Sequence, residues 1–414
     1  MKIRNIPGGV TAAAGFSAAC CAAGIKYAGR TDMAMLFSDV PCQTAGTFTS
    51  NRFKAAPVLW DMEIVYGAKT AQAVVVNAGI ANACTGEEGL SLCRATAECA
   101  GEALHIPASS VLLGSTGVIG PQLPLDKLSF GVRQMASSLS GSAEAGTAAS
   151  RAIMTTDTVN KEAALAIDLP TEDGSTVTVH LGGMSKGSGM IHPNMCTMLA
   201  YLTTDIAIAQ PLLQKALSEV VQDTFNMISV DGDTSTNDTL LILANGLAGN
   251  RPVLQEDDSY ALFRDALFTL CRTLAVKMAG DGEGATHLIE MRVTHADTKE
   301  NARVLARSVV SSSLVKAMIF GKDANCGRVL CALGYAGPAF DPAKVELTLN
   351  GADGDLCFYR NGNVLAFDEE KALRILSETE IRFTCDMGAG DAEATAWGCD
   401  LTYDYVKING DYRS

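Results

Sequence analysis

The segment KGSGMIHPNMCTML, residues 186–199, combines residue types that can carry nucleophilic chemistry. A rigid turn of His192, Pro193 and Asn194 comes shortly before Thr197, which opens an apolar run that predicts a β-strand. A threonine hydroxyl is a weak nucleophile, but a freed α-amine of the same residue, with a pKa of about 7.7–8.0, can act as its general base. By themselves these residues leave two interpretations of Thr197 open: a nucleophile released by cleavage, or a β-branched residue that begins a strand.

Glycine-rich loops elsewhere in the chain do not match a nucleotide-binding pattern. Residues 182–189 hold four glycines, which excludes a helix, and they place Lys186 before Gly187 where a Walker A loop needs Gly-Lys followed by Ser or Thr. The pair Gly388 and Gly390 lacks the third glycine of a dinucleotide-binding loop. We therefore expect no nucleotide cofactor.

Composition excludes several classes of partner. The chain has 414 residues, with 48% hydrophobic and 19% charged side chains, which predicts two compact lobes or one large α/β unit. The 32 Lys and Arg against 46 Asp and Glu give a net charge of −14, and no basic cluster offsets it, so we expect no nucleic-acid partner. The 13 cysteines form no C-x-x-C pair and only five histidines accompany them, so we expect reduced thiols and no metal site.

An Ala-rich stretch at residues 10–25 follows Lys2 and Arg4 and partly matches a signal peptide. Gly15 interrupts the stretch, and Phe16 is the one large apolar residue between its ends, so export is not expected. The sequence contains no run of about 18 apolar residues, which predicts that no helix crosses a membrane. We expect a cytoplasmic protein without a membrane partner.

Short β-like runs alternate with longer helical runs, which is typical of an α/β fold. Strands are expected at 73–76, 111–113, 163–169, 176–181 and from near Thr197. Helices are expected after Pro211, from about 260 to 278, and from 299 to 319. The polar segments 77–79 and 114–117 predict turns after the first two strands, and alternating apolar residues predict strands at 345–349 and 401–405.

Eight ordered regions of the sequence, the first of which comprises three short segments, match one known family. They are GGVTA, SDVP and TSNRFKAAPV near the start, NACTG at 82–86, GSTGVIG at 114–120, AIMTTDT at 152–158, KGSGMIHPNM at 186–195, VDGDTSTNDT at 230–239, DGEGAT at 281–286 and YVKINGDYRS at 405–414. Through these segments the chain closely resembles the ornithine acetyltransferase family, the bifunctional glutamate N-acetyltransferases and amino-acid acetyltransferases of arginine biosynthesis.

The resemblance implies a fold and a processing step. The fold is an α/β self-processing sandwich of two β-sheets flanked by helices, of the N-terminal Thr nucleophile type. The chain would cut itself between Cys196 and Thr197 into an alpha chain, residues 1–196, and a beta chain, residues 197–414. Two alpha and two beta chains would then form a heterotetramer. Cys196 stands where the family usually has Ala, and because a thiol is a better nucleophile than a hydroxyl, cleavage before Cys196 is an alternative.

The resemblance also implies the reaction and its residues. Thr197 would take the acetyl group of N2-acetylornithine and pass it to L-glutamate by a ping-pong mechanism, without a cofactor, and acetyl-CoA as a further donor is left open. Thr116 and Gly117 match the oxyanion hole of the family. The implied substrate-binding positions are Thr155, Lys186, Thr197, Glu283, Asn409 and Ser414. Lys186 suits a substrate carboxylate, and Glu283 suits a substrate ammonium group.

Two other functions remain to be compared with acetyl transfer. An aminopeptidase or amidase of the same self-processing fold would release the acyl group from Thr197 to water. A binding protein that keeps the fold without catalysis would bind an amino acid and remain uncut. The fate of the acetyl group and of the bond between residues 196 and 197 distinguishes these functions.

Overall fold

The structure is a computed structural model that describes residues 2–192 and 198–411. Three predicted site residues, Cys196, Thr197 and Ser414, lie outside the described residues. The described chain divides into two compact units. The first unit comprises residues 2–187, 198–222 and 234–274, and the second comprises residues 188–192, 223–233 and 275–411.

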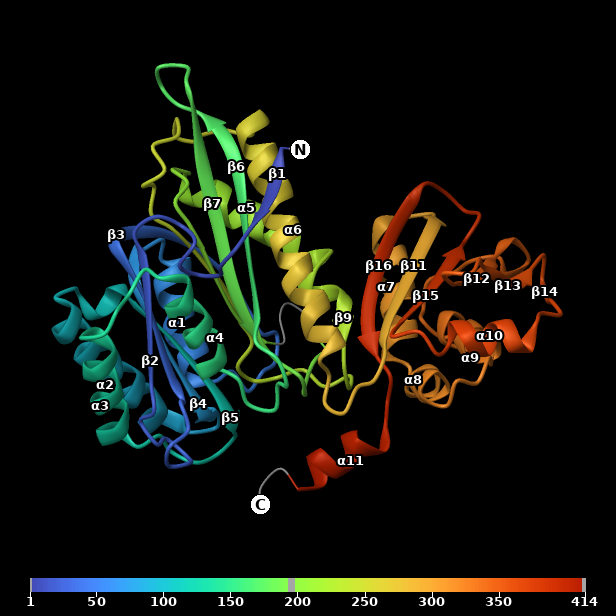
Figure 1. Cartoon of the computed structure of the whole chain (residues 1–414), viewed down its shortest axis with the longest axis horizontal. Coiled ribbons are helices and arrows are strands. Elements are labelled where there is room, and N and C mark those ends of the chain that lie inside the picture. Colours follow the sequence, from blue (N-terminus) through green and yellow to red (C-terminus); the bar gives the residue numbers. More distant parts are fainter. Residues whose placement is uncertain (1, 193–197, 412–414) are drawn as a thin grey trace. The chain divides into compact units, whose positions relative to one another are not determined.

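The first unit contains a nine-stranded mixed sheet with the order β1-β6-β7-β8-β10-β3-β4-β5, in which β2 also pairs with β3 (Figure 1). Its strands are β1 Ile3–Ile6, β2 Phe16–Cys21, β3 Met33–Phe48, β4 Ala71–Ile80, β5 Val111–Val118, β6 Lys161–Pro170, β7 Thr176–Lys186, β8 Leu199–Thr204 and β10 Thr239–Ala244. The long strand β3 belongs to both halves of the sheet, because its first part pairs with β2 and β4 while its last part pairs with β10.

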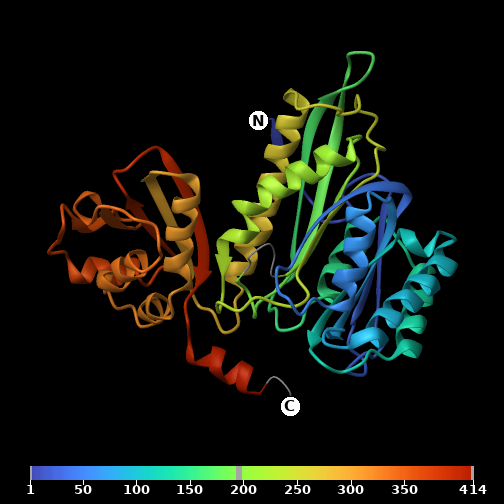
Figure 2. The same ribbon diagram turned by 180° about the vertical axis from the view of Figure 1, so that it is seen from behind.

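Helices cover both halves of this sheet (Figures 1 and 2). They are α1 Ala56–Tyr66, α2 Gly86–Leu104, α3 Leu125–Ala136, α4 Ala143–Ala152, α5 Gln210–Gln222 and the first part of α6 Asp258–Gly280, with a 3-10 turn at Ala108–Ser110. The helices α2 and α3 pack against each other and against the half that contains β2 and β5. Figure 2 shows α5 and α6 beside the half that contains β6 and β7.

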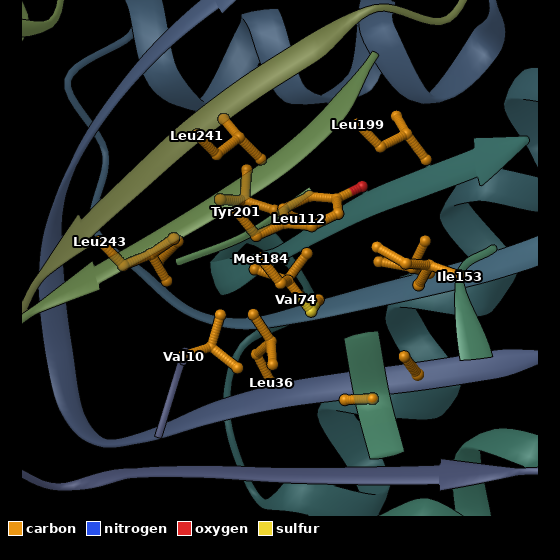
Figure 3. Close-up of a cluster of buried hydrophobic side chains, with 14 of the residues drawn as sticks. Val10, Leu36, Val74, Leu112, Ile153, Met184, Leu199, Tyr201, Leu241 and Leu243 are labelled. Carbon is orange, nitrogen blue, oxygen red and sulfur yellow. The ribbon is translucent and has the colours of Figure 1, made fainter. Parts of the chain in front are cut away.

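Alternate residues of the strands face two different hydrophobic cores, as the period of two in a β-strand requires. The core between the two halves of the sheet contains Leu36, Val74, Leu112, Met184, Leu199, Tyr201, Leu241 and Leu243 (Figure 3). The core beneath α2 and α3 contains the strand residues Met35, Val75 and Leu113. This division confirms the predicted arrangement of β-sheets flanked by helices.

The second unit contains a seven-stranded sheet with the order β14-β13-β12-β15-β11-β16-β9. Its strands are β9 Ile228–Ser229, β11 Leu288–Ala296, β12 Glu346–Asn350, β13 Leu356–Arg360, β14 Asn363–Val364, β15 Glu380–Asp386 and β16 Ala392–Cys399. Its helices are α7 Lys299–Ser311, α8 Ser313–Phe320, α9 Cys326–Gly334, α10 Glu369–Ile375 and α11 Tyr403–Gly410, with 3-10 turns at Phe225–Met227 and Pro342–Lys344. The helix α7 packs on β9, β11 and β16.

The two polar turns predicted at 77–79 and 114–117 are wrong, because both segments continue as strands. In the parallel pair of β4 and β5, Gly79 lies opposite Gly117. Both glycines have positive φ angles, +108° and +131°, and a Cβ atom on Gly117 would collide with the backbone of Gly79. The glycines that suggested turns are therefore required where two strands approach closely.

Two predictions in the second unit also need correction. The expected strand at 401–405 is instead the beginning of α11, since three alternating residues are too short a pattern to distinguish a strand from a helix. The expected helix at 299–319 is interrupted at Ser312, whose extended backbone ends α7 and whose side chain accepts a hydrogen bond from Val315 N–H to cap α8. The remaining predicted strands and helices are confirmed, with slightly different ends.

The buried carboxyl group of Asp61 accepts a hydrogen bond from the backbone of β5. Asp61 of α1 is fully buried, and its Oδ1 atom accepts a hydrogen bond from Leu113 N–H at 2.8 Å. Its Oδ2 atom has no hydrogen-bond partner in residues 2–192 and 198–411. Burial raises the pKa of Asp61 well above its ordinary value, although the Leu113 N–H opposes this. Burial therefore favours the protonated form of Asp61 in the folded protein.

Substitution of Asp61 by Asn is expected to stabilise the protein at neutral pH. The unfolded chain ionises Asp61 above pH ~4, whereas burial in the folded protein favours the protonated form, so Asp61 lowers stability as pH rises above ~4. Asn cannot ionise and still offers an oxygen to Leu113 N–H. The melting temperature of Asp61→Asn should exceed that of wild type by about 2–4 °C at pH 7, with no gain below pH ~4. Asp61→Leu, which removes the acceptor, should melt below wild type at both pH values.

Candidate functional site

The predicted oxyanion-hole residues lie near the end of β5. Thr116 pairs with Ala78 and Gly117 pairs with Gly79 across the parallel ladder of β4 and β5. The Thr116 side chain is partly exposed, so its hydroxyl can be reached from outside the core. The close packing of Gly117 on Gly79 fixes the backbone at this point, which is what a preorganised oxyanion hole needs.

Asn237 supports the same strand from a different part of the chain. Its side-chain Nδ2 donates hydrogen bonds to Ser115 O at 2.8 Å and to Ala81 O at 2.5 Å. The Ser115 carbonyl belongs to the same planar peptide unit as the Thr116 N–H, so Asn237 fixes the orientation of that peptide. The sequence patterns did not single out Asn237, although the VDGDTSTNDT segment contains it.

Three of the predicted site residues meet at the end of β7. Lys186 is the last residue of that strand, and its Nζ donates hydrogen bonds to Thr155 Oγ1 at 2.7 Å and to Thr116 Oγ1 at 3.1 Å. The Lys186 side chain is only 9% exposed. Residues 31 and 70 positions away in the sequence are thus brought to one ammonium group. We call this group of Thr116, Thr155 and Lys186 the ammonium cluster.

Asp157 lies behind the ammonium cluster, and its carboxylate contacts two lysines. Lys161 Nζ donates to Asp157 Oδ1 at 2.7 Å, and Lys186 Nζ lies 3.9 Å from Asp157 Oδ2. The carboxylate also accepts Gly187 N–H at 2.7 Å and Thr155 N–H at 3.1 Å. Burial alone would raise the pKa of Asp157, but Lys186, Lys161 and the Gly187 N–H together lower it to about 2. Asp157 is therefore ionised and holds the backbone on either side of the cluster.

Two further predicted residues meet in the second unit. Asn409 of α11 donates from Nδ2 to Glu283 Oε2 at 2.7 Å. Glu283 follows α6 and is 7% exposed, and its backbone N–H donates to Ser188 O at 2.9 Å. A Cβ atom on Gly189 would lie 2.6 Å from Glu283 Oε1, so the carboxylate rests against the glycine backbone. The structure thus brings together Glu283 and Asn409, two of the positions that the family resemblance implies.

The segment before the predicted cleavage bond is anchored by residues that the sequence patterns did not select. Asp231 accepts hydrogen bonds from Met190 N–H at 2.5 Å and Ile191 N–H at 2.9 Å, and the Tyr405 hydroxyl donates to it at 3.2 Å. Met190 has a positive φ of +55°, a conformation that costs energy for a residue with a side chain. The two hydrogen bonds to Asp231 hold this strained backbone in place.

His192 is anchored next to the same segment. Its Nδ1 lies 3.1 Å from Ser229 Oγ, and its Nε2 lies 3.1 Å from Arg307 Nη2. Burial and the positive charge of Arg307 lower the pKa of His192 to about 4, so the imidazole is neutral near pH 7 and Nε2 accepts the hydrogen bond from Arg307. This hydrogen bond holds the Arg307 side chain beside His192, five residues before the predicted nucleophile.

The side chains of Thr116, Thr155, Lys186 and Glu283 offer hydroxyl, ammonium and carboxylate groups for chemistry. No three His, Cys, Asp or Glu side chains in residues 2–192 and 198–411 are arranged to hold a metal ion. Within the same ranges, no helix has the length and apolar character that a membrane-spanning segment needs. The lysine beside two hydroxyls suits an anionic group of a small molecule, and the carboxylate beside an amide suits a cationic group.

A family model and two similar proteins agree on one family. The ArgJ family model matches residues 17–414. The chain is 53% identical over 411 residues to the arginine biosynthesis bifunctional protein ArgJ of Symbiobacterium thermophilum, with 99% of each chain covered. It is 47% identical over 400 residues to the protein of the same name from Thermotoga neapolitana, with 94% of this chain and 99% of that one covered. A solved structure of ornithine acetyltransferase complexed with ornithine, from Mycobacterium tuberculosis, is 43% identical with a TM-score of 0.41, covering 46% of this chain and 98% of that one.

Proposed function

The chain belongs to the ArgJ family, and from this premise we propose that it is an acetyltransferase of arginine biosynthesis that moves acetyl from N2-acetylornithine to L-glutamate. The observation that carries the proposal is the ammonium cluster, in which Lys186 Nζ donates to both Thr155 Oγ1 and Thr116 Oγ1. Lys186, which is suited to bind a substrate carboxylate, thereby contacts Thr116, which is suited to stabilise an oxyanion. The enzyme acts in the cytoplasm, and acetyl-CoA is a second donor to be tested.

The proposed maturation begins with the Thr197 hydroxyl. Its Oγ attacks the carbonyl carbon of Cys196, the acyl group moves from the amide nitrogen to this oxygen, and water hydrolyses the resulting ester. The products are an alpha chain, residues 1–196, with a new carboxylate, and a beta chain, residues 197–414, with a free amine on Thr197. The hydrogen bonds from Met190 and Ile191 to Asp231 support this step, because they hold the preceding segment in one conformation. Two chains of each kind form the heterotetramer.

The proposed transfer uses the same hydroxyl twice. The free amine of Thr197 takes the hydroxyl proton as Oγ attacks the acetyl carbonyl of N2-acetylornithine. The Thr116 hydroxyl and the Gly117 N–H stabilise the tetrahedral oxyanion, and ornithine leaves with a proton on its amine. The amine of glutamate then attacks acetyl-Thr197 and leaves as N-acetylglutamate. Lys186 binds the substrate carboxylate, while Glu283 and Asn409 orient a substrate amine, and Ser414 contributes a further hydroxyl.

The first test is the intact mass of the denatured wild-type protein, with sequencing of the amino termini. Two fragments, one of which begins Thr-Met-Leu, are expected. The same preparation, kept folded, should convert N2-acetylornithine and glutamate into ornithine and N-acetylglutamate. A single uncut chain, or a cut protein without transfer, would contradict the proposal.

An assay without glutamate distinguishes the hydrolase alternative from the proposed transferase. An acyl-Thr enzyme that water deacylates rapidly would release acetate from N2-acetylornithine whether or not glutamate is present. The proposed transferase should form little acetate and should make N-acetylglutamate only when glutamate is added. Replacing N2-acetylornithine by acetyl-CoA in the same assay tests the second donor.

Substitution of Gly189 by Ala is expected to weaken substrate binding while leaving the fold intact. The new Cβ would push the Glu283 carboxylate aside, which is easy because it is the end of a flexible side chain. Loss of a charge-assisted contact to the substrate amine should raise KM by about 10- to 100-fold. The control is Gly334→Ala, where nothing lies within 4 Å of the added atom. If Gly189→Ala has the KM of wild type, Glu283 does not bind the substrate amine.

A further inference from the structure

Lys161 is a fully buried lysine that the proposed reaction does not use. It lies at the start of β6, its side chain is 0% exposed, and its Nζ donates to Asp157 Oδ1 at 2.7 Å and to Val159 O at 3.3 Å. Because it has no contact with solvent, it is not a ligand of the substrate. It contacts Asp157, the carboxylate that Lys186 also approaches.

Stability alone does not account for this ion pair. Removing two charges from water costs several kcal/mol each, and buried pairs are often replaced by apolar residues without loss of stability. The pair does have a clear electrostatic consequence. Asp157 is 3.9 Å from Lys186, so without Lys161 its negative charge would be balanced by Lys186 alone. With Lys161 present, Asp157 is already balanced, and the three groups together carry one positive charge.

The placement of that excess charge suits anion binding. Lys186 Nζ donates hydrogen bonds to Thr155 Oγ1 and Thr116 Oγ1, so each hydroxyl accepts from the ammonium and its own proton points elsewhere. A hydroxyl that accepts from a cation is also a stronger donor. Both features favour an anion next to Thr116, whether it is a substrate carboxylate or an oxyanion.

We propose that Lys161 is a positioning residue that sets the charge of the substrate site: by balancing Asp157, it makes the positive charge of Lys186 available to the carboxylate of the amino-acid substrate. The proposal rests on the proposed function, since it takes Lys186 as the carboxylate partner. It adds a residue, 25 positions before Lys186 in the sequence, that never touches the substrate yet determines its affinity.

The test compares Lys161→Met with the double variant Asp157→Asn, Lys161→Met in the full-length, self-processed protein. The single variant leaves Asp157 to neutralise Lys186, so its dissociation constant for L-glutamate, measured by calorimetry, should rise about tenfold or more. The double variant again carries one positive charge, and the amide oxygen introduced at position 157 can still accept Gly187 N–H. It should therefore bind glutamate more tightly than the single variant.

A purely structural role for Lys161 also predicts recovery in the double variant, because an unpaired buried carboxylate is more destabilising than the loss of both charges. In that case the loss of glutamate affinity should follow the loss of folded protein, whereas the proposal predicts weak binding by Lys161→Met even where its melting curve shows a fully folded protein. The proposal is overturned if Lys161→Met binds glutamate as tightly as wild type, or if the double variant binds no better than Lys161→Met. Melting curves of both variants show that folded proteins are compared. Calorimetry requires no turnover, so a protein that binds glutamate but transfers no acetyl group would overturn the proposed function while this comparison still decides the role of Lys161.

Discussion

Replacement of Thr197 by Ala is expected to leave a single chain of 43.3 kDa without acetyltransferase activity. In the proposed mechanism the substitution removes the hydroxyl that attacks the Cys196 carbonyl, so no new amine should form, and it removes the atom that would carry the acetyl group. Loss of a catalytic nucleophile typically lowers kcat by a factor on the order of 10⁴ to 10⁶. Denaturing electrophoresis, intact mass and the transfer assay measure the two effects on one preparation.

Two control variants identify the nucleophile. Thr197→Ser keeps a hydroxyl and should still be cut and active. Cys196→Ala restores the residue that the family usually has, and it should be cut at the same bond. A Thr197→Ala protein that is cut or active contradicts the mechanism. A fragment that begins Cys-Thr in the wild type would assign the chemistry to Cys196 instead.

Replacement of Thr116 by Val is expected to lower kcat by about 10²–10³. Val preserves the branched shape of the side chain on β5 but removes the hydroxyl that accepts from Lys186 Nζ and that we propose as a donor to the oxyanion. Because the oxyanion exists only in the transition state, the loss should fall mainly on kcat, with a smaller rise in KM. Steady-state kinetics with N2-acetylornithine and glutamate measure both constants.

The matched control is Thr116→Ser, which keeps the hydroxyl within reach of Lys186 and should retain most of the activity. In the proposed maturation the Cys196 carbonyl passes through a similar tetrahedral state, so Thr116→Val should also accumulate uncut chain at early times after synthesis. A kcat within about threefold of wild type would remove Thr116 from the oxyanion hole.

The sequence alone was sufficient for the features that depend on neighbouring residues. The strands expected at 163–169 and 176–181 are β6 and β7, and they pair antiparallel on either side of Asp173 and Gly174, because strand-forming residues and a tight turn are both local properties. The candidate nucleophile is local in the same sense, since residues 196 and 197 share the peptide bond in question. Ordered segments along the chain were enough to indicate the family.

Local patterns failed where a distant segment decides the conformation. Glycines at 79 and 117 predict turns when each is considered alone, and only the close approach of β4 and β5 makes them strand residues. Likewise, an alternating pattern at 401–405 does not specify a strand without a neighbouring strand to pair with, and these residues enter α11 instead. A short stretch of sequence does not show whether a distant strand will pair with it.

The sequence by itself determined which residue types are available and the family they indicate, but only the tertiary structure decided which of them act together. Lys186 meets Thr116 across 70 residues and Thr155 across 31. The strands β5 and β7 are not neighbours in the sheet, but residues of both lie in the core between its two halves, and this packing brings their ends together. Burial then gives the contacts their strength, since Asp157 and Lys161 are held away from water. Charge in a desolvated site depends on three-dimensional neighbours, and the order of residues along the chain does not encode it locally.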